Sequence, residues 1–182
     1  MRDLTGLLFP RSVAVVGASR NPDTVNYAIF KNVTNGFSGP IYAVNPKYKE
    51  VLGRPCFPRL EDLPEPVDLV VIAIPAQHVN PVLRSCGKLG IKNIAVISAG
   101  FKEAGEEGAR REQELTKIAE EYGLNVLGPN CFGLISTRVG LNTTFAPRGA
   151  LPGDVAFLSQ SGAFCSSVLD WAWQVGLGFS QF

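Results

Sequence analysis

The chain has 182 residues, of which 46% are hydrophobic and 18% are charged. This composition is globular and excludes a disordered protein. The length suits one domain, or one domain and part of another. A formal net charge of +1 argues against a protein that holds nucleic acid mainly through phosphate contacts.

No apolar run approaches the roughly 18 residues of a membrane span. Asp3, Pro10 and Arg11 interrupt the only apolar stretch near the N-terminus, so we expect no secretory signal. The four cysteines are scattered without a C-x-x-C pair, which predicts buried thiols and a cytoplasmic location. The single histidine excludes any mechanism that needs two histidines from this chain.

Short apolar runs alternate with segments of helical period along the first 130 residues. Helices are predicted at 25–36, from Asn80-Pro81 onward, and at 106–122, which is the clearest of the three. Strands are predicted at 12–16, 41–44, 67–74, 93–98 and 126–127. Strands that are apolar along their whole length indicate a parallel sheet covered on both faces. The predicted fold class is therefore α/β, with a doubly wound, mostly parallel sheet of the Rossmann-like, nucleotide-binding kind.

The chain changes character after residue 133. Residues 133–153 lack a sustained period and are rich in glycine, proline and threonine, which predicts an interdomain connection. A strand at 154–158, a helix at 163–175 and a strand from Gly178 then begin a second α/β domain. The predicted division is 1–133, 134–153 and 154–182. Trp171 and Trp173 favour packing in a core or a domain interface, and Asp170 between them favours solvent.

Ligands of open parallel sheets bind beyond the carboxyl ends of the strands. The residues there are mostly small, which allows the backbone to approach a ligand, and Arg20 and Lys47 add positive charge. Together they predict a site for a phosphate-bearing ligand. The segments concerned are Gly17-Ala18-Ser19-Arg20, Asn45-Pro46-Lys47, Pro75-Ala76-Gln77, Ser98-Ala99-Gly100-Phe101 and Gly128-Pro129-Asn130.

Two of these strand ends allow alternatives. The first turn has Gly17 but Ser19 in place of a second glycine, so Gly17 either admits a ligand or simply ends the strand. The second strand end has Lys47 where an NAD site carries an acidic residue. Lys47 favours a phosphorylated ribose, as in coenzyme A or NADP, over NAD; the alternative is a solvated turn lysine.

The turn Ser159-Gln160-Ser161-Gly162 lies between a predicted strand and a predicted helix. It could hold a phosphoryl group at the helix N-terminus, or Ser159 or Ser161 could act as an ordinary N-cap. A hydrolase nucleophile is disfavoured, because its motif needs glycine where Ser159 stands and His78 lies in the other domain. His78 itself favours an exposed helix start over a ligand contact. No cluster of residues has metal-ligand spacing.

Several motifs in the right order resemble the NDP-forming acyl-CoA synthetases, represented by ADP-forming acetate–CoA ligase. The resemblance covers essentially the whole chain. The motifs lie at residues 9–22, 42–47, 73–76, 97–103, 127–131 and 158–164.

The resemblance implies a CoA-binding domain related to the α subunit of succinyl-CoA synthetase, followed by the start of a flavodoxin-like domain. The reaction implied is acyl-CoA, ADP and phosphate giving acid, ATP and CoA, through an acyl phosphate and a phosphohistidine. The Ser159 to Gly162 turn resembles the helix N-terminus that receives this phosphohistidine. The implied CoA contacts are Gly17, Ala18, Ser19, Arg20, Lys47, Pro75, Ser98, Ala99 and Gly100, with Asn130 supporting them.

The chain departs from the family pattern at two points. Asn26 stands where the family often has glycine, and no residue matches the phosphohistidine, which is expected beyond Phe182. The ATP-grasp domains, which would bring ADP or ATP and magnesium, are also missing. We therefore expect the N-terminal part of a larger ligase that binds CoA or acyl-CoA but is inactive alone.

The expected partners are the ATP-grasp domains or subunit of the same ligase, in an oligomer when complete, with neither nucleic acid nor membrane. Two alternatives remain at this stage. One is a free-standing CoA or NADP sensor, which would end near Gly133. The other is a ligase-like region fused to a protein acetyltransferase.

Overall fold

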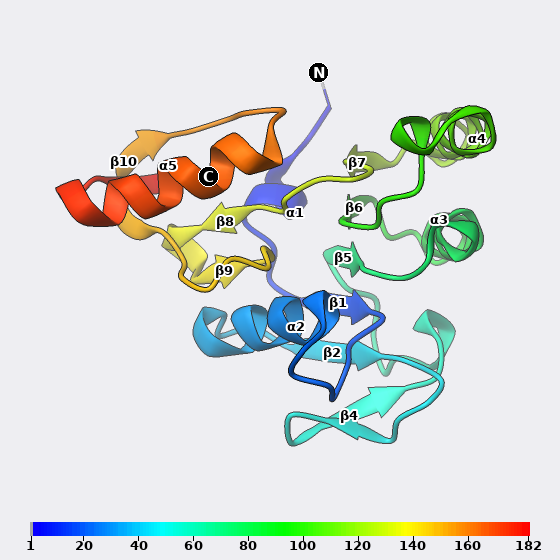
Figure 1. Ribbon diagram of the computed structural model, residues 1–182. Helices are drawn as coiled ribbons and strands as arrows, with labels where there is room; N and C mark the ends of the chain where they lie inside the picture. Colours follow the sequence, from blue (N-terminus) through cyan, green and yellow to red (C-terminus); the bar gives the residue numbers. More distant parts are fainter. Residues whose placement is uncertain (1) are drawn as a thin grey trace.

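A computed structural model describes residues 2–182. Its centre is a seven-stranded sheet, and a smaller four-stranded sheet lies to one side (Figure 1). Five strands of the large sheet form a parallel ladder in the order β2-β1-β5-β6-β7. Their bounds are β1 Val13–Val16, β2 Ile41–Val44, β5 Leu69–Ile72, β6 Asn93–Val96 and β7 Asn125–Leu127. The predicted doubly wound α/β fold is confirmed.

The central strand β1 is buried on both faces, which explains why it is apolar along its whole length. Val13 and Val15 face one hydrophobic cluster, whereas Ala14 and Val16 face another. Helix α2 (Val25–Gly36) packs in the first cluster through Ile29, Phe30 and Val33. Helices α3 (Val79–Lys88) and α4 (Glu106–Tyr122) cover the opposite face (Figure 1).

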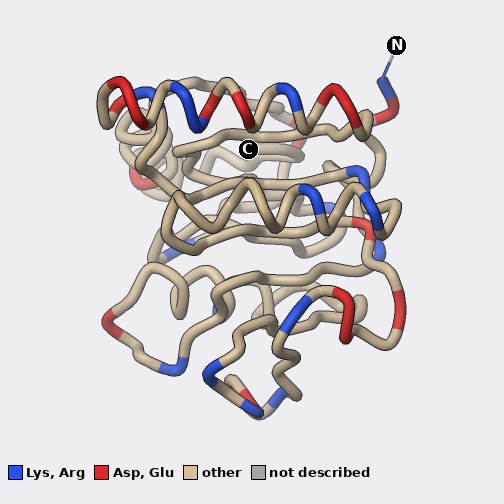
Figure 2. The backbone as a smooth tube through the Cα atoms, turned by 90° about the vertical axis from the view of Figure 1, so that its right-hand side faces the viewer, with Lys and Arg blue, Asp and Glu red and all other residues tan. Residues whose placement is uncertain are grey.

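The ends of α2 and α4 follow from local sequence. Thr24 is the N-cap of α2, and its hydroxyl accepts a hydrogen bond from the Tyr27 N–H. Helix α4 has Glu106 and Glu107 in its first turn and ends at Gly123 in the left-handed conformation. Charged residues of both signs run along α4 (Figure 2), which suits its solvent-facing side.

Helix α3 begins differently from the sequence prediction. The N-cap is His78, not Asn80, because a 3₁₀ turn at Ala76–His78 runs directly into the helix. Asn80 is buried instead, and its side-chain amide donates to the Arg111 carbonyl at 3.1 Å and to Glu114 at 3.0 Å. The asparagine therefore joins α3 to α4 rather than starting a helix.

Three elements near the first strands had no sequence signal. Helix α1 spans Thr5–Leu8, and β3 (Glu50–Val51) and β4 (Arg54–Phe57) form a hairpin. Strand β4 adds to the sheet parallel to β2. These strands are short and contain charged residues and a proline, so they lack the apolar pattern that identified the others.

The predicted connection carries two strands of its own. Strands β8 (Ile135–Ser136) and β9 (Leu141–Asn142) join β10 (Leu151–Ala156) and β11 (Gly178–Gln181) in the smaller sheet. Its order is β10-β11-β8-β9, and β10 and β11 are parallel. Leu134 and Leu141 belong to the same hydrophobic cluster as β1 and α2. The segment is thus packed against the first unit.

Helix α5 (Gly162–Val175) covers part of the smaller sheet. Cys165 and Leu169 are buried in a third cluster with Phe132 and Ile135. Trp171 and Trp173 are 53% and 39% exposed, so the described residues do not place them in a core. Asp170 is exposed, as expected.

The described part of the chain, residues 2–182, offers no helix with the length and apolarity that crossing a bilayer requires. Its four cysteines are free thiols, three of them buried.

The close approach of β9 and α2 gives a stability prediction. A Cβ atom at Gly140 (φ +67°) would lie 2.2 Å from the Gly36 carbonyl oxygen, whereas one at Gly123 (φ +63°) would meet nothing within 4 Å. We expect Gly123→Ala to cost about 1–2 kcal/mol from backbone conformation alone. Gly140→Ala should cost about 1–3 kcal/mol more, because β9 must move. Urea unfolding measures both, and equal losses would contradict the packing.

Candidate functional site

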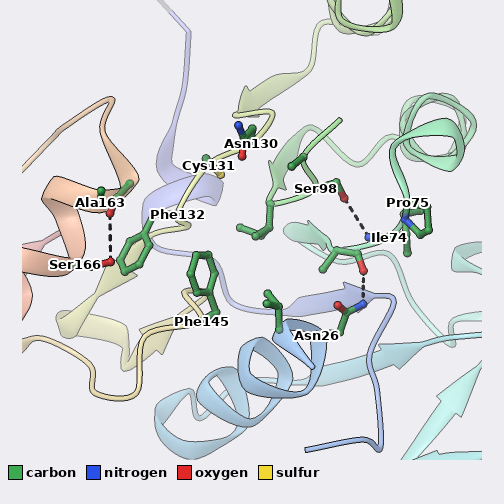
Figure 3. Close-up of a pocket in the computed structure, with 15 residues that line it drawn as sticks. Asn26, Ile74, Pro75, Ser98, Asn130, Cys131, Phe132, Phe145, Ala163 and Ser166 are labelled. Atoms are coloured by element: carbon green, nitrogen blue, oxygen red, sulfur yellow. Dashed lines mark hydrogen bonds between the residues drawn. The ribbon is translucent and has the colours of Figure 1, made fainter. Parts of the chain in front are cut away.

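A cleft of about 770 Å³ opens at the carboxyl ends of the large sheet, between that sheet and the start of α5 (Figure 3). The residues after β5, β6 and β7 form one wall, and the first turn of α5 forms the other. The lining residues are Val25, Asn26, Ala73, Ile74, Pro75, Ile97, Ser98, Ala99, Asn130, Cys131, Phe132, Phe145, Gly162, Ala163 and Ser166. This is the edge where ligands of open parallel sheets bind.

Ser98 fixes the spacing of two strand ends in the cleft wall. Its hydroxyl accepts from the Ile74 N–H at 3.0 Å and donates to the Ile72 carbonyl at 3.4 Å. The Asn130 N–H donates to the Ser98 carbonyl at 3.0 Å, and Asn130 has a φ of +52° that asparagine tolerates better than most residues. Ser98 and Asn130 thus order the backbone around the cleft.

The cleft has a neutral lining with an aromatic end. Of the described residues, no aspartate, glutamate, lysine, arginine or histidine lines it. Phe132 and Phe145 meet edge to face with their ring centroids 5.2 Å apart, and Phe145 is 39% exposed. Such a lining suits a neutral ligand portion with amide or hydroxyl groups rather than a phosphate.

Positive charge lies instead beyond the ends of β1 and β2, at one flank of the cleft. Arg20 is exposed, and its guanidinium lies 5.9 Å from the centre of the Tyr48 ring. Lys47, the residue before Tyr48, is also exposed, and its N–H donates to Asn45. The Asn45 amide donates to the Ala18 carbonyl at 2.9 Å and so ties the two strand ends together. We call Arg20 and Lys47 the cationic flank.

The structure brings some predicted residues into the cleft and leaves others outside it. Pro75, Ser98, Ala99, Asn130 and Gly162 line the cleft. The turn of Gly17, Ala18 and Ser19 is buried at the same sheet edge. Outside the lining are Gly17, Ala18, Ser19, Arg20, Lys47, Gly100, Ser159, Gln160 and Ser161.

Several predicted backbone donors, besides those of Lys47 and Asn130, already have partners within the protein. The Gly17 N–H donates to the Val44 carbonyl at 2.8 Å. The Gly100 N–H donates to the Glu103 carboxylate at 2.6 Å. The Ser161 N–H donates to the Ser159 hydroxyl at 3.1 Å. None of these three N–H groups is therefore free for a ligand in this conformation.

The start of α5 is an N-cap, as one of the sequence alternatives predicts. The Ser161 hydroxyl accepts from the Phe164 N–H at 3.2 Å. His78 is exposed at the start of α3 and does not line the cleft. Within residues 2–182, no group of three His, Cys, Asp or Glu side chains could hold a metal ion.

Three cleft residues carried no sequence signal. Phe132 directly precedes the segment without a regular period, Phe145 lies within it, and Ser166 lies inside α5. Asn26 was noticed only as a departure from the family pattern. Their positions depend on how the smaller sheet and α5 fold back over the strand ends, and a sequence pattern does not encode that approach.

The fold and the cleft at the strand ends define a ligand-binding protein of the doubly wound, Rossmann-like class. A family model described as "CoA binding domain" matches residues 11–137, and one described as "Succinyl-CoA ligase like flavodoxin domain" matches residues 152–182. The chain belongs to the family of CoA-binding domains.

Curated relatives confirm the resemblance to ADP-forming acyl-CoA synthetases. The chain is 50% identical over 175 residues to ADP-forming acetate–CoA ligase I of Archaeoglobus fulgidus, covering 96% of this chain and 25% of the relative. It is 42% identical over 173 residues to the α subunit of ADP-forming acetate–CoA ligase II of Pyrococcus furiosus, covering 95% of this chain and 38% of the relative. The chain thus spans a quarter to two fifths of these relatives.

A solved structure agrees with the fold across both units. It is the dinucleotide-forming acetyl-coenzyme A synthetase 1 of Candidatus Korarchaeum cryptofilum, in complex with phosphate and ADP. The TM-score is 0.94 at 41% identity, and the match covers 100% of this chain and 39% of that chain. The expected start of a second, flavodoxin-like domain is therefore confirmed.

The end of β1 gives a prediction about backbone packing at the cleft. A Cβ atom at Gly17 (φ +97°) would lie 2.2 Å from the Ala73 carbonyl oxygen, whereas one at Gly105 (φ +95°) would meet nothing within 4 Å. Both alanine variants should lose about 1–3 kcal/mol from the backbone conformation. Gly17→Ala should lose clearly more in thermal unfolding, because the ends of β1 and β5 must separate. Equal melting temperatures would contradict this contact.

Cys131 lines the cleft, but its thiol is protected. Burial raises the pKa of this thiol to about 11, so at pH 8 about one molecule in 1,000 carries the thiolate. We expect alkylation of Cys131 to be about 100-fold slower in the folded protein than in urea, where the ordinary pKa of about 9 returns. Mass spectrometry of iodoacetamide-treated protein measures this, and equal rates would contradict the burial.

The raised pKa of Cys131 also makes the stability of the fold depend on pH. The folded protein keeps Cys131 protonated to a higher pH than the unfolded chain does. The buried, protonated thiol therefore stabilises the fold fully below about pH 9, and this contribution to the free energy of unfolding declines between about pH 9 and 11.

Proposed function

We propose that this chain is the CoA-binding part of an ADP-forming acyl-CoA ligase, and that its cleft and cationic flank hold one CoA molecule. The observation that carries the proposal is the division of the carboxyl edge into a neutral cleft and a positively charged flank. Coenzyme A has the same division, because a neutral pantetheine arm is joined to an adenosine that carries three phosphate groups. The family match and the names of the relatives support this ligand.

In the proposed complex, the phosphates lie toward the ends of β1 and β2, near Arg20 and Lys47. The turn of Gly17, Ala18 and Ser19 gives the backbone access to them. The pantetheine arm runs along Pro75, Ser98 and Ala99 toward α5, with Asn130 shaping the wall. Gly100 supports the turn after β6 through its backbone conformation (φ +102°), which an L-residue rarely adopts.

The start of α5 is the proposed place where a phosphoryl group is received during turnover. Ser159, Gln160 and Ser161 are exposed there, and Gly162 faces the cleft. The helix has 14 residues, and its N-terminal dipole favours an anion. We propose the division 1–133, 134–153 and 154–182, with the middle segment as a packed connection.

Turnover requires more than this chain supplies. We propose that the rest of the flavodoxin-like domain provides the phosphohistidine, and that ATP-grasp domains, fused or on another subunit, provide ADP or ATP and magnesium in an oligomeric ligase. The chain spans only 25% and 38% of two relatives named as ADP-forming acetate–CoA ligases, which supports additional domains. The four free thiols support a reducing compartment, the cytoplasm.

Isothermal titration of the chain tests the proposed ligand directly. We expect CoA to bind more tightly than NADPH, because the neutral cleft matches the pantetheine arm and not a nicotinamide nucleotide. Binding of NADPH without binding of CoA would contradict the proposal and favour a dinucleotide sensor.

Lys47 gives a second prediction. If its ammonium group meets the 3′-phosphate, Lys47→Ala should weaken CoA by about 1–3 kcal/mol, which is roughly 5- to 150-fold, and leave 3′-dephospho-CoA nearly unchanged. Lys49→Ala is the matched control, because Lys49 is an exposed lysine two residues away. Equal weakening of both ligands by Lys47→Ala would remove this role.

A further inference from the structure

Asn26 lies in the first turn of α2, over the gap between the ends of β1 and β5. The chain leaves β1 toward β2 on one side and later returns to β5 on the other. This gap is therefore the topological switch point of the sheet, where the crevice of a doubly wound fold opens. A ligand in the crevice would lie beside the Asn26 side chain, which lines the cleft.

The orientation of the Asn26 amide is fixed by two backbone groups. Its nitrogen Nδ2 donates to the Gly17 carbonyl at 2.9 Å and to the Ala73 carbonyl. Both partners are carbonyl oxygens, which only accept, so turning the amide over would place oxygen against oxygen. Both N–H groups of the amide are thus used, and the oxygen Oδ1 must point elsewhere.

The cleft is where Oδ1 points. Asn26 lines the cleft and is half-buried, and the protein does not bury its Oδ1 atom without a partner. It takes part in no hydrogen bond within residues 2–182 and is therefore open to a ligand or solvent. Figure 3 shows the amide nitrogen joined to the end of β5 and the oxygen on the side of the cleft.

We infer that Asn26 is a ligand-contacting specificity residue, whose oriented oxygen accepts a hydrogen bond from an N–H or O–H group of the pantetheine arm. The arm has two amide N–H groups and a hydroxyl, whereas the phosphates offer mainly acceptors and belong at the cationic flank. The inference rests on the proposed function, because it assumes that CoA occupies the cleft.

Glycine at this position could not do the same. It would leave the Gly17 and Ala73 carbonyls without the amide donor and would place no side-chain oxygen in the cleft. Asparagine joins the Gly17 and Ala73 carbonyls at the base of the crevice and offers one acceptor of set direction.

The test compares CoA with 3′-phosphoadenosine 5′-phosphate, which lacks the pantetheine arm. We expect Asn26→Ala and Asn26→Gly to weaken CoA by about 2- to 10-fold, the loss of one neutral hydrogen bond, and to leave the nucleotide unchanged. Asn93→Ala is the matched control. The Asn93 amide also donates to a strand-end carbonyl, that of Asp68, but at the opposite edge of the sheet, so both affinities should stay unchanged.

Three outcomes would overturn the inference. The first is unchanged or tighter CoA binding by Asn26→Gly, which makes Asn26 a space-filling group. The second is equal weakening of CoA and the nucleotide, which makes it a structural group. For variants that do not fold, the third uses the unaltered chain: the side-chain amide NMR signals of Asn26 should shift with CoA and not with the nucleotide, and identical spectra would overturn it.

A failure of the proposed function gives a different result. In that case the unaltered chain itself binds no CoA. If the unaltered chain binds CoA and only the Asn26 measurements fail, the proposed function stands and this inference falls.

Discussion

The close contact between the ends of β1 and β5 is the constraint on which the site depends. Gly17 has no room for a side chain because the Ala73 carbonyl lies where a Cβ atom would be. The contact keeps the two strand ends near each other at the switch point. Asn26 then joins both strand ends through one amide. One glycine and one asparagine therefore hold the two strand ends together at the base of the crevice.

A second feature is the separation of neutral and charged surface along one sheet edge. The turns after β1 and β2 carry Arg20 and Lys47, whereas the turns after β5, β6 and β7 carry small or neutral residues. Parallel strands put all these turns at one edge of the sheet, so the charged turns and the neutral turns lie in two adjacent parts of that edge. A ligand with a charged end and a neutral arm matches that order.

The smaller sheet closes the cleft from the other side. Strand β9 packs against α2, and Leu134 and Leu141 join the main core. The start of α5 is thereby held opposite the strand ends, where Gly162 and Ala163 line the cleft. The exposed Trp171 and the edge strand β10 leave apolar surface that the described residues do not cover.

The sequence by itself determined the parallel sheet and helix α4, because buried strands and helix ends leave local patterns. It also predicted five residues that line the cleft, which are Pro75, Ser98, Ala99, Asn130 and Gly162. Tertiary structure decided the rest. The β3–β4 hairpin is too short and polar to show the apolar pattern of a strand. Asn80 forms a hydrogen bond from α3 to α4 and does not cap a helix. Phe132, Phe145 and the direction of the Asn26 oxygen depend on contacts between residues far apart in the chain. Such contacts exist only once the chain has folded.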